Sequence, residues 1–128
     1  MIGREHIRFK PVEMSGGGWH TPEGFPPGLK AKILSGELDE VNKRGSRTRL
    51  MQFEPGAFTT ESLVHEFWEE VYVVSGEFFG IGESDRPPES YSQHTYTCRP
   101  PGIVHGPFKS DTGCVLLEIH YFDPDEAR

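Results

Sequence analysis

The segment HEFWEEVYVVSG, residues 65–76, decides the fold class, because it fits two different periods. As a surface helix, it gathers its apolar residues on one side and leaves His65 and Glu69 as a solvated pair on the other. As a strand that begins after a turn, it directs the same histidine and glutamate towards the mouth of a β-barrel. Periodicity alone does not separate the two interpretations, so the rest of the chain has to decide.

The composition favours an all-β architecture. The 128 residues include 15 Gly and 11 Pro, which implies frequent turns and short elements. This length suits one domain with a buried core, and 9 Phe and 4 Tyr can fill much of that core. We therefore expect a single domain over residues 1–128, in which residues 1–28 form an N-terminal extension and an ordered Gly/Pro-rich loop.

Charge and cysteine content limit the partners and the location. The net charge is −7 and no basic run extends beyond Lys43-Arg44, so no nucleic-acid partner is expected. No apolar stretch approaches the length of a membrane span, so no membrane partner is expected either. Cys98 and Cys114 form no CxxC pair and are interpreted as reduced, buried thiols. The predicted location is the cytoplasm.

Candidate strands lie on both sides of the opening segment. Residues 29–38 predict a strand that closes at Ser35-Gly36, and residues 46–56 predict a second strand that ends in a Pro55-Gly56 turn. A helix that began at residue 61 would therefore lie between strands. Its second half, VYVVSGEFF, is also strongly β-prone.

The second half of the chain also predicts strands. Residues 83–93 predict a polar loop, and residues 94–100 have the β-branched and aromatic content of a strand. Residues 99–122 predict a β-hairpin with His105 on its first arm.

Two half-motifs decide between the helix and the strand interpretation of residues 65–76. Pro100, Gly102 and His105 follow the spacing P-x-G-x-x-H, and upstream His65 precedes Glu69 by four residues. Together they resemble the two motifs of the cupin superfamily. The local sequence is most similar to small single-domain cupins related to the metal-binding domain of ChrR-like proteins.

The resemblance covers about residues 45–122 and implies the cupin double-stranded β-helix, a small jelly-roll-like barrel. It also implies one divalent metal ion inside the barrel, held at positions that match His65, Glu69 and His105. The first cupin motif has a further histidine, and this chain has Leu63 at the position that matches it.

Two imidazoles and one carboxylate suffice to hold a metal. Such a set suits Fe(II) first, while Zn, Mn, Ni or Cu are also possible. A fourth ligand or pocket group could come from Glu61, which shares a strand face with His65, or from His94 or His120.

Three further polar residues are candidates if they face inward. Glu118 and His120 share one face of the last predicted strand and would then be catalytic acid or base groups, whereas facing outward they are surface residues. Arg49 would hold an anionic substrate. The remaining mouth of the barrel is predicted to be apolar and aromatic, with few polar groups near the metal.

The resemblance implies a dioxygenase that acts on a small oxygenated or aromatic substrate. The alternatives are a metal-dependent lyase or isomerase with Glu118 or His120 as proton shuttle, a non-catalytic metal- or ligand-binding sensor, and a cupin that has lost its metal, for which Leu63 is the evidence. Family resemblance further predicts a homodimer.

Overall fold

The computed structural model describes residues 2–81 and 87–125, and over these residues the chain is all-β with no helix. The strands are β1 (Leu29–Asp39), β2 (Arg44–Phe53), β3 (Trp68–Gly80), β4 (Glu89–Ser92), β5 (Tyr96–Arg99), β6 (Phe108–Lys109) and β7 (Cys114–Tyr121). The strand interpretation of the opening segment is therefore confirmed. No helix in this part of the chain could span a membrane.

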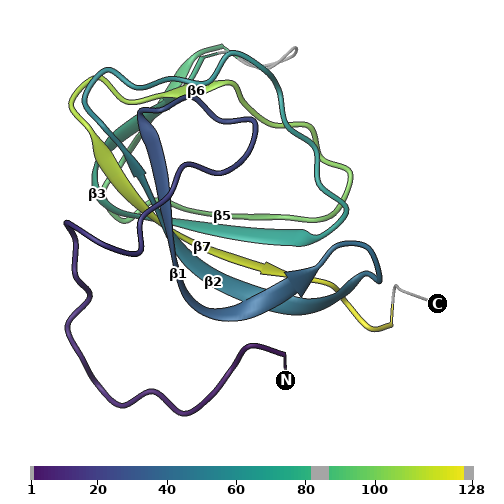
Figure 1. Ribbon diagram of the computed structural model, residues 1–128. Coiled ribbons are helices and arrows are strands. Elements are labelled where there is room, and N and C mark those ends of the chain that lie inside the picture. Colours follow the sequence, from purple (N-terminus) through teal and green to yellow (C-terminus); the bar gives the residue numbers. More distant parts are fainter. Residues whose placement is uncertain (1, 82–86, 126–128) are drawn as a thin grey trace.

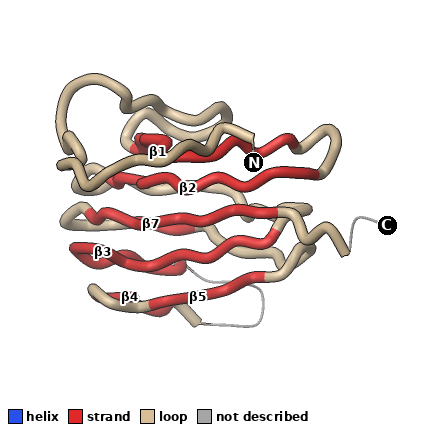
Figure 2. Tube along the Cα trace, turned by 90° about the horizontal axis from the view of Figure 1, so that it is seen from below, coloured by secondary structure: helices blue, strands red, loops and turns tan. Residues whose placement is uncertain are grey.

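The strands form an antiparallel barrel-like arrangement in which β3 serves two sheets (Figures 1 and 2). The order β1-β2-β7-β3 makes the larger sheet, and β5 pairs with the first half of β3. The second half of β3 pairs with β4 and β6 in the other sheet. One long strand thus joins the two faces of the molecule.

Local irregularity lets β3 pass from one sheet to the other. The register with β7 shifts between Val73 and Ser75, and Gly76 has a φ of 77°. A Cβ atom at Gly76 would lie 2.2 Å from the carbonyl oxygen of Gly113. Only glycine fits at this crossing.

Alternation along parts of the strands directs apolar side chains into the space between the sheets. In β3 the side chains of Val71 and Val73 point inward, while Trp68 faces outward and stacks on Tyr121. The buried apolar cluster consists of Leu29, Ala31, Met51, Phe53, Val71, Val73, Phe78, Phe108, Cys114 and Leu116. Part of it, including Met51, Phe53 and Phe108, also borders the polar side chains of the barrel interior.

Two predicted boundaries are wrong. Ser35-Gly36 does not close the first strand, because β1 continues to Asp39 and absorbs the irregularity as a register shift between Ile33 and Ser35. The loop predicted at 83–93 contains β4, while its residues 83–86 lie outside the described part of the chain.

The predicted hairpin at 99–122 is also wrong, since β6 pairs with β3 and β7 lies between β2 and β3. His105 instead forms an isolated bridge with Leu63.

Of the two cysteines, Cys114 is buried as expected, but Cys98 is exposed.

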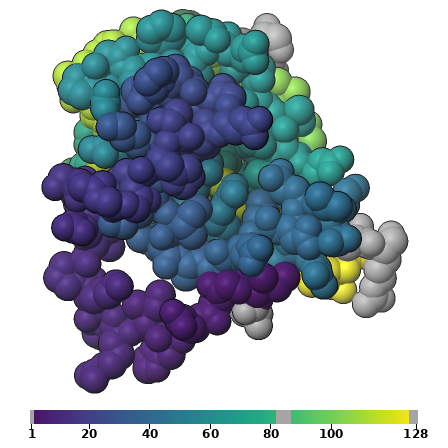
Figure 3. All heavy atoms as spheres, viewed as in Figure 1, coloured from purple at the N-terminus to yellow at the C-terminus, as the bar shows by residue number. Residues whose placement is uncertain are grey.

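The N-terminal segment, residues 2–28, contacts the barrel at Arg4 and again from Glu13 onwards. Arg4 donates hydrogen bonds to the hydroxyls of Ser35, Ser46 and Thr48. Further along, Lys32 of β1 donates a hydrogen bond to the carbonyl of Glu13, and His20 forms a bridge with Ala31. Between these points the segment projects from the body of the molecule, as the purple chain in Figure 3 shows.

Candidate metal centre

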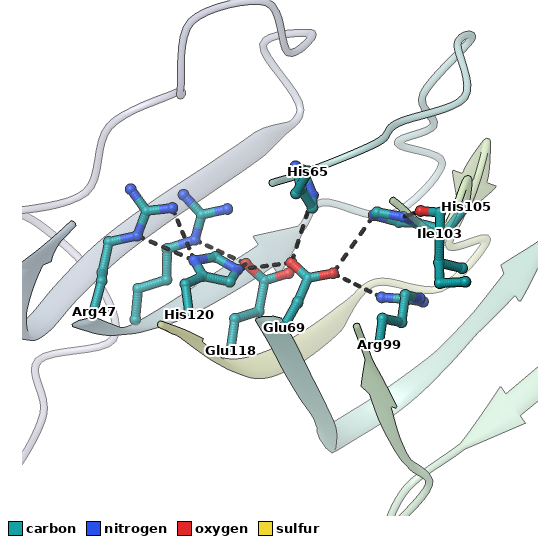
Figure 4. A network of polar contacts seen from close by, with 9 residues as sticks. Arg47, His65, Glu69, Arg99, Ile103, His105, Glu118 and His120 are labelled. Carbon is teal, nitrogen blue, oxygen red and sulfur yellow. Dashed lines mark hydrogen bonds and ion pairs between the residues drawn. The ribbon is translucent and has the colours of Figure 1, made fainter. Parts of the chain in front are cut away.

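The centre is built around Glu69, which β3 points into the barrel and leaves only 5% exposed. The sheet register sets its neighbours, since Glu69 lies directly opposite His120 of β7 on one side and Arg99 of β5 on the other. His120 Nε2 is 2.7 Å from Glu69 Oε2, and Arg99 Nη1 is 2.7 Å from Glu69 Oε1. The carboxylate is therefore held at both oxygens, as Figure 4 shows.

Two more histidines approach the same carboxylate from loops. His105 Nε2 lies 3.5 Å from Glu69 Oε1, and His65 Nε2 lies 3.9 Å from Glu69 Oε2. The Leu63–His105 bridge brings the two loops together, and the ring of His65 stacks on Phe67 at a centroid distance of 4.5 Å. The structure thus brings together His65, Glu69 and His105, the three residues predicted as ligands.

The hydrogen bonds of His105 identify its tautomer. Its Nδ1 is 3.1 Å from the carbonyl oxygen of Ile103, which can only accept a hydrogen bond. Nδ1 therefore donates to this carbonyl, and Nε2, which lies nearer Glu69, is the nitrogen that could bind a metal. A backbone carbonyl that fixes a histidine in this way is a common outer partner of a metal ligand.

His120 has the opposite tautomer. Arg47 reaches its Nδ1 with Nε at 3.1 Å and Nη2 at 2.8 Å, and a guanidinium can only donate. The ring proton must then lie on Nε2, where it is donated to Glu69. His120, which is fully buried, supports the carboxylate and offers no lone pair to a metal.

Electrostatics keep the set in its ligating form. Burial raises the pKa of Glu69, but the hydrogen bond from His120 and the charge of Arg99 outweigh it and lower the pKa to about 2. Burial lowers the pKa of His65 to about 4, against an opposing pull from Glu69. At neutral pH the carboxylate is ionised and the His65 imidazole is neutral.

Glu118 is the second buried carboxylate. It accepts a hydrogen bond from Arg49 Nε at 2.8 Å, and both side chains are 10% exposed. Its Oε1 lies 3.9 Å from His120 Nε2. Glu69, Glu118 and His120 form a second cluster of possible ligands. The proton on His120 and the guanidinium on Glu118 make this cluster the poorer cation site.

A cavity of about 410 Å³ opens onto the first cluster. Part of its wall is apolar, as predicted, and includes Phe25, Leu29, Met51, Phe53, Leu63, Phe67, Val71 and Phe108. The prediction of few polar groups is wrong, because Arg47, Arg49, Arg99 and Glu118 also line it.

The structure keeps two of the predicted pocket residues away from the centre. Glu61 is exposed and lines a separate pocket beside Phe25, because residues 61–67 form an irregular segment before β3 starts. His94 lies in a turn on the outer surface and bonds through Nδ1 to the hydroxyl of Tyr72 at 2.6 Å. Neither belongs to a possible ligand cluster among the residues the structure describes.

Sequence reasoning missed Arg47 and Arg99. Arg47 shares a strand face with Arg49, and the period of two along β2 could have indicated it. Arg99 directly precedes the second half-motif, but only the register of β5 on β3 places it beside Glu69.

The first cluster fits a divalent metal ion. The donor atoms of His65, Glu69 and His105 lie within 4.8 Å of one another. The two hydrogen bonds to Glu69 use only part of the four lone-pair sites of a carboxylate. Two neutral imidazoles and one carboxylate suit Zn and the other transition metals.

Several solved structures share the fold of this chain. An RmlC-like cupin from Shewanella frigidimarina NCIMB 400 is 22% identical with a TM-score of 0.65, and the match covers 98% of each chain. An acetylacetone dioxygenase from Acinetobacter johnsonii is 16% identical with a TM-score of 0.64, covering 100% of this chain and 87% of that one. The polyketide cyclase RemF from Streptomyces resistomycificus is 18% identical with a TM-score of 0.66, covering 91% and 81%.

The sequence itself matches no family model and no curated protein. The three-dimensional matches define the class: this chain has the cupin fold, and its buried histidine and glutamate side chains could hold a metal within it.

Proposed function

We propose that this chain is a metal-dependent enzyme that acts on a small oxygenated or aromatic molecule, with a dioxygenase as the first candidate. The observation that carries the proposal is the cluster of possible ligands, in which His105 is oriented by the carbonyl of Ile103 and Glu69 by Arg99. The fold shared with an acetylacetone dioxygenase supports it further.

The chain's own residues would hold the metal and receive the substrate beside it. His65, Glu69 and His105 would bind the ion, and the aliphatic side chain of Leu63 contributes no ligand. The substrate would enter the adjoining cavity, whose wall combines apolar side chains with three arginines and Glu118. A bound divalent ion supplies Lewis acidity, and iron supplies redox chemistry with O₂ as well.

Metal content tests the site. Protein purified without chelators should hold one divalent ion per chain, and the His105→Ala variant should hold none above background. The His94→Ala variant is the matched control, because His94 lies on the outer surface and should leave the metal content unchanged. A His105→Ala protein that kept its metal would refute the site.

Oxygen uptake tests the chemistry. Iron-loaded protein should consume O₂ in the presence of a chelating enol such as acetylacetone, and the His105→Ala variant should not. Activity that persisted with zinc and did not depend on O₂ would contradict the dioxygenase.

A metal-dependent lyase or isomerase is the second candidate function, and the position of Glu118 favours it. This carboxylate is buried, lines the cavity and lies 3.9 Å from His120 Nε2, so it is placed to move a proton on a bound substrate. A Glu118→Gln variant should then lose turnover while it keeps its metal. Metal binding without any turnover would instead favour the sensor.

A further inference from the structure

The cavity carries positive charge that the metal site does not use. Three guanidinium groups, from Arg47, Arg49 and Arg99, line it together with the buried carboxylates of Glu69 and Glu118. Among its buried and half-buried charged side chains the cavity thus has three guanidinium groups and two carboxylates, in a protein whose net charge is −7. Glu23 and Glu40 also line the cavity and belong to exposed residues, where water weakens their charge, although Glu40 still interacts with Arg47.

Arg49 is the strongest sign of a missing partner. Its side chain is 10% exposed, and it gives Nε to Glu118. No other acceptor in residues 2–81 and 87–125 takes a hydrogen bond from its two terminal nitrogens. A guanidinium has five N–H donors, and Arg49 lines the cavity, so its terminal N–H groups are available to an anion that enters it.

Arg47 stands two residues away on the same face of β2. It uses Nε and Nη2 on His120 and has further N–H groups to donate. Burial lowers the pKa of Arg47, and the positive charge of Arg49 lowers it further. Two like charges at this spacing repel each other, and an anion between them would remove that cost.

We infer that the substrate is a small carboxylate, whose carboxyl group is held by Arg49 and Arg47 while its oxygenated end faces the metal position. The inference deepens the proposed function and rests on it for that position. His120 links the two sites, because its ring touches Arg47 at one nitrogen and Glu69 at the other. The apolar wall then accepts the uncharged part of the molecule.

A matched pair of probes tests the carboxylate class. Acetoacetate and acetylacetone have the same number of non-hydrogen atoms and each offers a ketone oxygen to the metal, but only acetoacetate carries a carboxylate for the two arginines. Calorimetric titration of Zn(II)-loaded protein gives the ratio of their affinities. A bound metal alone also favours the anion, so the change in this ratio between variants is the informative quantity.

The Arg49→Gln variant should lower the affinity ratio by roughly tenfold, the usual effect of losing a hydrogen bond to a charged group. Arg47→Gln should lower it as well. Arg44→Gln is the matched control, since Arg44 lies at the exposed end of the same strand and pairs with Asp39. An unchanged ratio in both Arg49→Gln and Arg47→Gln, with zinc content retained, overturns the inference.

The Arg49→Gln substitution leaves the buried carboxylate of Glu118 without its positive partner, which could prevent folding. In that case the double variant Arg49→Gln/Glu118→Gln, which removes both charges, takes its place in the test. It should show the same reduced ratio, and a ratio at the wild-type level would overturn the inference. Metal-free protein separates the two proposals. Without zinc, Arg49→Gln should still weaken acetoacetate binding, whereas failure of zinc to bind would refute only the metal centre.

Discussion

At the scale of single residues, Glu69 is the group on which the site depends. Two strands hold its oxygens through His120 and Arg99, and two loops bring His65 and His105 to the same carboxylate. Glu69 and His105 are therefore ordered by hydrogen bonds, and His65 by stacking on Phe67, before a metal binds. Such preorganisation lowers the cost of binding.

Leu63 offers a direct test of the ligand geometry. It pairs with His105 in an antiparallel bridge, so the two side chains point to the same side. A Leu63→His variant should add a fourth ligand and strengthen metal binding by roughly tenfold or more, the size of change that outer partners alone produce. Competition with a coloured chelator measures this affinity.

Val64→His is the control for that experiment, because Val64 is the neighbouring residue and is 60% exposed. It should leave the affinity for metal unchanged. Equal affinity in the Leu63→His and wild-type proteins would mean that position 63 does not reach the metal.

The site was only partly predictable from sequence, and the distance along the chain between partners explains why. His65 and Glu69 are four residues apart and His105 sits in a recognisable turn motif, so local spacing indicated all three. The contact of Arg47 with His120 spans 73 residues, and that of Arg99 with Glu69 spans 30. Those contacts depend on strand register, which no local pattern contains.

At the scale of elements, the crossing of β3 between the sheets is a point of strain. Replacing Gly76 by alanine forces a side chain into a left-handed backbone and against the Gly113 carbonyl. The Gly76→Ala variant should lower the free energy of unfolding by about 3 kcal/mol or more. Urea denaturation monitored by tryptophan fluorescence measures the change.

Gly56→Ala provides the comparison. Gly56 has a similar φ of 83°, but a Cβ atom there meets nothing within 4 Å. The Gly56→Ala substitution should lower the free energy of unfolding by about 1 kcal/mol, from the backbone conformation alone. Equal losses in the two variants would show that the contact with Gly113 contributes nothing.

The strands themselves were more predictable than their partners. Alternation along residues 46–53 and the β-prone end of residues 65–76 indicated β2 and β3, and the spacing of Pro100, Gly102 and His105 indicated the barrel. The predicted hairpin failed because β6 found its partner in β3. Local turn signals describe where a strand ends, but tertiary packing selects its neighbour.

At the scale of the whole molecule, acid should destabilise the metal-free protein in two stages. Burial lowers the pKa of His65 from 6.5 to about 4, so between these values the unfolded chain binds more protons than the folded one. The free energy of unfolding should therefore fall as the pH drops from 6.5 towards 4. Glu69, with its pKa lowered from 4.5 to about 2, should add a further loss as the pH falls through that range.

Urea denaturation of metal-free protein over this pH range measures both stages. A His65→Asn variant should lose the decline between pH 6.5 and 4 and keep the decline at lower pH. If the variant and the wild-type protein show the same profile, another group causes the upper stage.

The N-terminal segment bears on the oligomeric state. Phe9 is fully exposed and Ile7 is about half exposed on the projecting part of this segment. Exposed apolar side chains on an arm are costly, and burying one contributes about 1.5–3 kcal/mol. We therefore expect a homodimer in which the arm packs on a second copy.

Light scattering after size exclusion should give the mass of two chains for the wild-type protein, and a Phe9→Ser/Ile7→Ser variant should shift towards one chain. Val41→Ser is the control, because Val41 is also exposed but lies in the turn between β1 and β2. A wild-type protein with the mass of one chain would contradict the expected dimer.

The position of β7 links the order of synthesis to the appearance of the site. It is the last strand of the sheet along the chain, yet it lies between β2 and β3. A nascent chain without it has two open strand edges, and Glu69 lacks the histidine that orients it. Closure of the barrel and assembly of the metal position are thus coupled, and a chain truncated before residue 114 should expose two unpaired strand edges and bind metal more weakly.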